Sequence, residues 1–348
     1  MANGNLFITY GAGPPADNGS RPIPSGPQVP AFWANPGLGL VPGSAAQDPS
    51  TYYESDVTQN TPANPETVVC PIAVQVSCKN DTSPTKAYQS IGVEVLVCDA
   101  STAVTSQTAL AFDQRFPNAI VMQGSWNQTD DTWPLTIPIT QLYPYAGFSA
   151  TKSGHVCLIG NCFGVTTGND TSTPDDGDSW FTALANIPPP VIDFQTLVQM
   201  DGHAAQHNIF VTSAPAQQDR PRISFPFNAV LPLERGSESV ILELQHPTGA
   251  EALTHSDLAF LKAGPYKHLP LHVSKVPVVD KFRIHGCDDG PGRTVKQHLH
   301  AGKPLPLTVE LELQHGETAG GVHCFNVVQK TAAGQVQGGL RLLMVISG

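Results

Sequence analysis

The sequence predicts an all-β protein: two antiparallel β-sandwiches in tandem, preceded by an extended arm rich in proline and glycine. The first observation behind this is that 31 glycines and 32 prolines occur among 348 residues, well above the roughly 12% of an average protein. The second is that only 14% of the residues are charged while 40% are hydrophobic. So many breakers exclude long helices, and this apolar content excludes a wholly disordered chain. The length allows about two domains.

The arm is predicted over residues 1–65, which hold 11 prolines and 8 glycines and almost no hydrophobic periodicity. Such a segment favours extended or polyproline conformation. It also carries Phe32, Trp33, Tyr52 and Tyr53, which a freely solvated tail would not need. We therefore expect the arm to lie on a surface, either its own or that of a neighbouring subunit, and these four aromatic residues to bind a partner.

The first sandwich is predicted over residues 66–216. Residues 67–78 and 91–98 are rich in β-branched side chains, and Val93, Val95 and Val97 alternate with Glu94 in the second of these segments. This alternation is typical of a strand with one buried face. Further strands are expected at 119–123, 134–140, 155–160, 191–199 and 207–213.

The second sandwich is predicted over residues 217–348, because the charge balance changes near residue 219. Residues 1–219 hold 5 basic and 18 acidic side chains, whereas residues 220–348 hold 13 and 11. Short strands separated by glycine, proline and aspartate are expected at 223–227, 239–245, 268–273, 280–284, 305–314, 323–329 and 338–346. One short helix is expected at 254–262. The sequence Leu-Glu-Leu-Gln-His occurs at 242–246 and again at 311–315; it indicates either a duplication or two similar strands of one sheet.

Three segments carry a resemblance to a known family. These are Gly-His-Val-Cys-Leu-Ile at 154–159, the run 201–211, and Phe-Asn-Val-Val-Gln at 325–329 followed by Gly-Gly-Leu at 338–340. They resemble strands of the CARDB-like, immunoglobulin-type modules of bacterial proteins, over about residues 60–214 and 218–348. The resemblance implies two immunoglobulin-like sandwiches. It implies no chemistry, because such modules serve as spacers, adhesive units and accessory domains, and a fold does not supply a function.

The sequence predicts no catalytic site and no cofactor. No Gly-x-Ser-x-Gly motif occurs and no cysteine lies in a nucleophile motif. Weak metal-ligand candidates are His285, Cys287, His298 and His300, but no fourth ligand and no C-x-x-C spacing accompany them. The pair at 203 and 207 has the spacing of a zincin motif without its glutamate. Exposed polar histidines are the favoured interpretation.

A cluster of aromatic residues offers an alternative site. Trp126, Trp133, Tyr143 and Tyr145 lie close together in sequence. On exposed loops such rings could stack on sugars. Their more common use is in the core of a sandwich.

Charge and targeting signals limit the partners. The net charge of −11 with few basic residues argues against nucleic acid, and no apolar run is long enough to span a membrane. The N-terminal segment lacks the features of a signal peptide, so we expect a protein that is cytoplasmic as synthesised or exported by another route. Seven scattered cysteines, an odd number, favour reduced thiols over a disulfide framework.

The leading hypothesis is a non-enzymatic structural or interaction protein, a β-sandwich subunit of a larger homo-oligomeric assembly such as a shell, fibre or surface layer. The long arm is the main reason, because extended arms commonly add a strand to a neighbour. One alternative is a carbohydrate-binding or adhesive accessory module that uses the aromatic cluster. A second alternative is a metal-dependent enzyme that uses the histidine-rich C-terminal half.

Overall fold

The structure is a computed structural model that describes residues 6–8, 21–22, 31–35, 38, 41–42, 67–76, 88–98, 101–103, 120–126, 130–138, 154–166, 177, 194–216, 222–231, 235–247, 261, 268–273, 279–287, 290–313 and 319–347. Strands dominate these residues, so the all-β prediction is confirmed. The elements of the first part are β1 (Leu6–Ile8), β2 (Val41–Pro42), β3 (Thr67–Val76), β4 (Tyr88–Cys98), β5 (Ile120–Trp126), β6 (Asp130–Pro138), β7 (Gly154–Thr166), helix α4 (Phe194–Met200) and β8 (Ala204–Pro215). Those of the second part are β9 (Arg222–Ala229), β10 (Ser237–Gln245), β11 (His272–Val273), β12 (Val279–His285), β13 (Thr294–His300), β14 (Leu305–Leu313), β15 (Gly321–Thr331) and β16 (Val336–Ser347).

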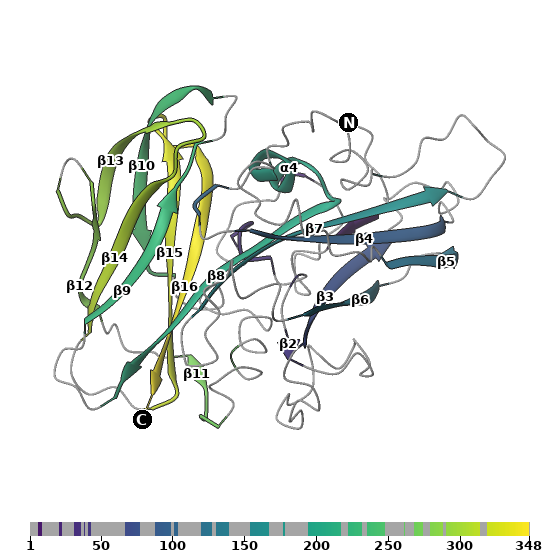
Figure 1. Ribbon diagram of the computed structural model, residues 1–348, viewed down its shortest axis with the longest axis horizontal. Helices are drawn as coiled ribbons and strands as arrows, with labels where there is room; N and C mark the ends of the chain where they lie inside the picture. The colour runs from purple at the N-terminus through teal and green to yellow at the C-terminus, as the bar shows by residue number, and fades with distance from the viewer. Residues whose placement is uncertain are drawn as a thin grey trace.

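The strands form three sheets (Figure 1). A nine-stranded sheet has the order β13-β10-β15-β16-β8-β7-β4-β5, with the short β11 added beside β15. A three-stranded sheet has the order β12-β14-β9, and a four-stranded sheet combines β1, β2 and β6 around β3. Most neighbours are antiparallel, but β16 and β8 run parallel, as do β11 and β15.

The C-terminal strands form a sandwich between the three-stranded sheet and one end of the long sheet. Strand β9 alternates exposed and buried residues, with Ile223, Phe225 and Phe227 turned inward. They meet inward residues of β10, β14, β15 and β16 such as Leu342 in one apolar core. The predicted C-terminal strands therefore do form a two-layer core, as burial of one face of each sheet requires.

The two smaller sheets lie on opposite faces of the nine-stranded sheet, and β8 belongs to both regions. Ala214 of β8 joins the core with the three-stranded sheet. Gly160 of β7 pairs with Ala205 on the other face of β8, and a Cβ built on Gly160 would lie 3.3–3.4 Å from Leu38 and from Ile8 of β1. The long sheet thus continues across the predicted boundary near residue 216, and the division into two tandem immunoglobulin-like domains stays a prediction.

Residues 191–199 were predicted as a strand, and this prediction was wrong, because residues 194–200 form helix α4. Phe194 and Val198 are both fully buried, four residues apart on one side of the helix. The backbone N–H of Asp201 donates to the carbonyl of Leu197, which extends the helical pattern by one residue. The strand was predicted from the β-branched residues of this segment, but the helical spacing of its apolar residues decides the structure. Of the predicted strand 268–273, only His272–Val273 is a strand.

The repeated Leu-Glu-Leu-Gln segments do not belong to one sheet, as the simpler interpretation held. The first lies in β10 of the nine-stranded sheet, and the second lies in β14 of the three-stranded sheet. Leu242 and Leu311 point into the same apolar core from the two opposite sheets. Of the predicted helix 254–262, Leu261 is helical and the other residues lie outside the described part.

Candidate functional site

The candidate site lies where β8 and β16 separate. Residues 209–215 of β8 pair with β16, beginning with Ile209 opposite Arg341. Before Ile209, residues 204–208 of β8 pair with β7 on one side and have no partner residue of β16 on the other side. We call residues 202–208, together with Gly339 of β16, the arm seat, because residues of the N-terminal arm occupy it.

The arm attaches to the seat by strand-type backbone pairing. The N–H of Asn35 donates to the carbonyl of Gln206 at 2.9 Å, and the N–H of Asn208 donates to the carbonyl of Trp33 at 2.8 Å. Ala34 is the antiparallel partner of His207 between these two bonds. The arm therefore adds a short strand to the open side of β8, which satisfies backbone groups that β16 leaves there.

Trp33 anchors this short strand on a glycine. Its side chain is 5% exposed and packs with Ala34 and Val328, and the Phe32 ring meets it edge-on at 4.9 Å. A Cβ built on Gly339 would lie only 2.5 Å from Cε2 of Trp33. Residue 339 must therefore be glycine for the indole to reach the strand backbone.

A buried histidine, His207, holds the arm at Asn35. His207 is 3% exposed, and its Nδ1 lies 2.8 Å from the carbonyl oxygen of Asn35. Because a carbonyl oxygen only accepts, this nitrogen carries the proton. The His207 imidazole thus donates a hydrogen bond to the arm.

A charged cluster holds the beginning of the arm at the other end of the seat. His203 Nδ1 lies 2.6 Å from Asp201 Oδ1, and the backbone N–H of His203 donates to the same oxygen. Arg21 donates to the carbonyl of Ile8, whose own N–H donates to the carbonyl of Gly202. Burial alone would raise the pKa of Asp201, but the hydrogen bonds and charge of His203 and the Arg21 guanidinium together hold that pKa below its ordinary value.

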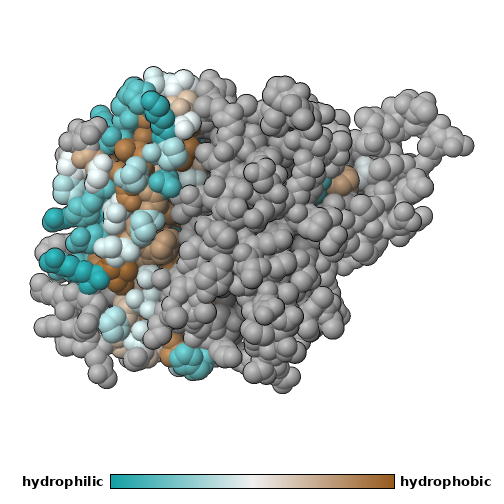
Figure 2. Space-filling view, viewed as in Figure 1, coloured by the Kyte–Doolittle hydropathy of each residue, from teal (hydrophilic) through white to brown (hydrophobic). Residues whose placement is uncertain are grey.

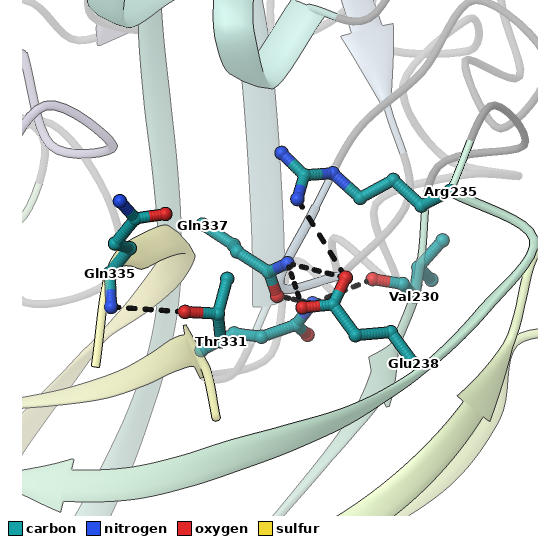
Figure 3. Close-up of polar contacts among 7 residues, drawn as sticks. Val230, Arg235, Glu238, Thr331, Gln335 and Gln337 are labelled. Carbon is teal, nitrogen blue, oxygen red and sulfur yellow. Dashed lines mark hydrogen bonds and ion pairs between the residues drawn. The ribbon is translucent and has the colours of Figure 1, made fainter. Parts of the chain in front are cut away.

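A chain of polar side chains links Arg235 and Glu238 with Gln337 of β16 (Figure 3). Arg235 lies 3.7 Å from the carboxylate of Glu238, which accepts hydrogen bonds of 3.3 and 3.4 Å from the Gln337 amide. Gln329 is fully buried and donates to Gln337 at 3.2 Å and to the carbonyl of Val230 at 3.0 Å. We call these residues, with Thr102, the polar seam.

The polar seam ties the end of β4 to the C-terminal sandwich. Thr102 donates its hydroxyl proton to Gln329 Oε1, and its backbone N–H donates to Asn228 at 3.0 Å. The Asn208 amide donates to the carbonyls of Ser101 at 2.8 Å and of Gly339 at 2.9 Å. Residues from both parts of the chain therefore share one buried hydrogen-bond network, which demands a fixed arrangement of the two parts.

The predicted partner-binding residues of the arm have different outcomes. Phe32 and Trp33 lie on their own chain at the arm seat, whereas Tyr52 and Tyr53 lie outside the described residues. Of the arm, the described residues 31–35 pack on a surface of their own chain. Contact of these residues with a partner stays a prediction.

The candidate metal ligands are distributed over two sheets. His285 ends β12, with its Nε2 3.5 Å from Glu310, and the half-buried Cys287 follows two residues later. His298 and His300 lie on β13 of the nine-stranded sheet, with their rings 5.1 Å apart. In the part of the chain that the structure describes, no three His, Cys, Asp or Glu side chains are grouped so that they could hold a metal ion.

The aromatic residues proposed to stack on glycans also lie in different places. Trp126 ends β5 at the margin of the nine-stranded sheet, and Trp133 lies in β6 of the four-stranded sheet. Tyr143 and Tyr145 lie outside the described residues. The structure thus assigns the two tryptophans to separate sheets, and sugar binding stays a prediction.

Gly339, Asn208, Gln329 and Thr102 were not identified from the sequence. The pair Gly338-Gly339 inside a hydrophobic strand is the one local signal, since glycine in a strand often marks a close approach of another group. Among the described cysteines, Cys157, Cys162 and Cys324 are buried. No helix within the described ranges is long and apolar enough to cross a membrane.

Comparison with known proteins adds little to this geometry. No protein-family model matches the chain, and no curated protein matches it. Among solved structures, the chain is similar to the collagen adhesin (CNA) from S. aureus, with 8% identity over 80% of this chain and 87% of that chain. The TM-score is 0.18, and a likeness at that level carries no argument about fold or function.

Proposed function

We propose that this protein is a non-enzymatic structural subunit that assembles with further copies of itself into a shell, fibre or surface layer. The observation that carries the proposal is the arm seat. There an extended segment from a proline- and glycine-rich region is held by backbone pairing with β8 and by one aromatic anchor, Trp33. Strand addition of this kind is a common way to join protein chains.

The arm seat supports assembly because its contacts do not depend on which copy supplies the arm. The same segment of a second copy would make the same bonds to Gln206 and Asn208, so exchange between copies changes few contacts. Residues 43–66 connect β2 to β3, and these 24 residues can span at most about 80 Å when extended. That reach is sufficient for the arm of one copy to occupy the seat of a neighbour.

Light scattering on the full chain tests the proposal. The molar mass should exceed that of one chain and rise with concentration from about 1 to 100 µM, an ordinary range for subunit association. Negative-stain microscopy of the same samples should show regular particles or filaments. A single chain mass at every concentration, with no particles, would contradict a structural subunit.

Cysteine cross-linking then tests whether the arm joins the copies. Ala34 and His207 form a non-hydrogen-bonded antiparallel pair, whose Cα atoms lie about 4.5 Å apart, within range of a disulfide. We expect a mixture of Ala34→Cys and His207→Cys chains, refolded together, to give a disulfide-linked dimer. Pairing Ala34→Cys with the exposed Val336→Cys is the matched control. A chain that carries both substitutions serves as the comparison. If that chain forms the disulfide within itself and the mixture of singly substituted chains forms no linked dimer, the arm does not link the copies.

A further inference from the structure

We infer that Cys98 of β4 and Cys157 of β7 form a disulfide when the chain folds in an oxidising medium. The two cysteines occupy directly opposite positions of the antiparallel pair β4–β7, whose strands lie side by side in Figure 1. The inference assigns a covalent modification to a single copy of the chain, so it does not depend on the proposed assembly.

Opposite positions of an antiparallel pair have the separation that a disulfide requires. Their Cα atoms lie about 4.5 Å apart in a non-hydrogen-bonded pair and about 5.5 Å apart in a hydrogen-bonded pair. A disulfide joins residues whose Cα atoms are about 4.4–6.8 Å apart. Both kinds of pair therefore meet the backbone requirement, and the bond between Cys98 and Cys157 needs no movement of the two strands.

The register that sets the two cysteines opposite each other is fixed by a buried polar pair. The pairing of β4 with β7 runs without a shift over residues 90–98 of β4. Within it Glu94 lies opposite Asn161, whose amide donates to the Glu94 carboxylate at 2.9 Å, and both side chains are buried. A slip by one residue would break this bond inside the protein. Because positions four apart on a strand share a face, the cysteine positions lie on the same face as this pair.

This position is distinctive among the cysteines of the described strands. Cys162 of β7 lies opposite Val93, and Cys324 of β15 lies opposite Leu343. In the strand pairs that the structure describes, β4–β7 is the one where two cysteines are opposite each other. An odd number of cysteines argues against a framework of disulfides, but it allows one cross-link between two of them.

The surroundings of Cys157 are compatible with oxidation. The side chain is fully buried and is present as a thiol, and its Sγ accepts a hydrogen bond of 3.8 Å from Nε2 of Gln206. Because the sulfur is the acceptor in this contact, loss of the thiol proton does not remove it. The reduced and the oxidised forms can therefore keep the same neighbours on β8.

The disulfide would secure the end of β4 where the chain enters the polar seam. Cys157 lies opposite Asn208 of β8, and the Asn208 amide donates to the carbonyl of Ser101, three residues after Cys98. The S–S bond and this hydrogen bond would hold the same short segment. The cross-link would also close residues 98–157 into a loop, which restricts the unfolded chain and so stabilises the folded one.

The bond forms by thiol–disulfide exchange with a small disulfide such as oxidised glutathione. One protein thiolate attacks a glutathione sulfur, which releases one reduced glutathione and leaves a mixed disulfide. The second protein thiolate attacks the protein sulfur of the mixed disulfide and releases the other glutathione. The two protein thiols lose two electrons and two protons, and the oxidised glutathione gains them. Since Cys157 is buried in the folded chain, the exchange takes place during folding.

Mass spectrometry of the refolded full chain tests the inference. The chain is refolded with a mixture of oxidised and reduced glutathione, its remaining thiols are alkylated in denaturant, and it is digested without reduction. We expect one pair of linked peptides, which contain Cys98 and Cys157, and alkylation of the other five cysteines. On a non-reducing gel the linked species should have the mass of one chain. Alkylation of all seven cysteines, or linkage of a different pair, would overturn the inference.

Serine substitutions then test the effect on stability. Reduction by dithiothreitol should lower the melting temperature of the oxidised wild type by roughly 5–10 °C, and it should leave that of Cys98→Ser unchanged. The matched control is Cys324→Ser, which replaces a buried cysteine that lies opposite a leucine. This control should keep both the linked peptides and the response to reduction. Cys98→Ala serves as a second variant if the serine prevents folding.

Each outcome decides the inference separately from the proposed function. Linked peptides that disappear in Cys98→Ser and persist in Cys324→Ser support the disulfide, whatever mass light scattering gives for the assembly. Equal responses of the wild type and Cys98→Ser to dithiothreitol would contradict a stabilising bond at this position. Linked species with the mass of two chains would mean that the cysteines join copies, which contradicts a bond between β4 and β7 of one chain.

Discussion

The C-terminal sandwich and the arm seat are held together by different kinds of interaction. In the sandwich, inward residues of two sheets pack in an apolar core with few polar atoms. At the seat and the polar seam, buried amides, hydroxyls and backbone groups bond to one another across segments far apart in sequence. Apolar packing tolerates many arrangements of similar volume, whereas a hydrogen-bond network requires one arrangement. We therefore expect burial in the sandwich to supply most of the stability, and the seat to fix how the arm and the first part of the chain attach to it.

The largest expected effect is loss of a core side chain in the sandwich. Phe225 is fully buried and meets Phe210 edge-on with centroids 5.2 Å apart. Replacing Phe225 by alanine should lower the free energy of unfolding by about 3–5 kcal/mol, measured by urea denaturation. Val336→Ala, which changes a 39% exposed residue, should cost well under 1 kcal/mol. Equal losses in the two variants would contradict the assignment of the core.

Much of the sandwich was predictable because its signals are local. The alternation of Ile223, Phe225 and Phe227 with exposed neighbours identifies β9 from sequence alone, and β13 alternates in the same way. Strands β15 and β16 are instead buried along almost their whole length. A strand with one buried face needs only apolar residues at every second position, and this alternation is visible in the sequence itself.

The connection between the two parts was not predictable from the sequence. The pairing of β8 with β16 joins residues 209–215 to residues 341–347, and no local pattern specifies which distant strand a parallel strand will meet. The contact at the arm seat was not predictable either, because Gly339 is required there only by Trp33, which lies about 300 residues earlier in the sequence. Helix α4 shows a different limit, since Phe194 and Val198 fit a helix and their neighbours fit a strand equally well.

The second largest effect is expected at the seat itself. Gly339→Ala would place a methyl group inside the Trp33 ring, and overpacking of this kind costs about 1–3 kcal/mol. Unfolding should be followed by urea denaturation in a double-mutant cycle with Trp33→Ala. The alanine at 339 should cost much less once the indole is absent, which gives a coupling free energy between the two sites. Additive losses would show that Trp33 does not occupy this position.

A smaller effect is expected in the polar seam. Thr102→Val keeps the shape of the side chain but removes the hydroxyl that bonds Gln329 and accepts from the N–H of Val230. Because both partners stay buried, the loss should be about 1–3 kcal/mol by urea denaturation. Thr308→Val on the half-buried outer side of β14 is the matched control and should be nearly neutral. A neutral result at Thr102 as well would mean that the seam contributes no stability.

The smallest effects should separate the two regions by pH. In the sandwich, burial of His246 beside the Phe325 ring lowers the pKa of that imidazole below its ordinary 6.5. At the seat, the pKa of Asp201 lies below its ordinary 3.8. In both cases the unfolded chain binds the proton more readily, so stability is lost as pH falls, first below about 6.5 for His246 and then below about 3.8 for Asp201.

Urea midpoints measured from pH 8 to pH 3 test this order. His246→Gln should remove part of the decline at mildly acidic pH and leave the decline near pH 3–4. Asp201→Asn should do the reverse, although Glu243, whose pKa is lowered chiefly by its hydrogen bond from Lys330, will keep some acid sensitivity in both variants. If both substitutions altered the same pH range, the two groups would not report on separate regions. Two distinct ranges would show that mild acid weakens the sandwich while the charged cluster at the arm seat still holds.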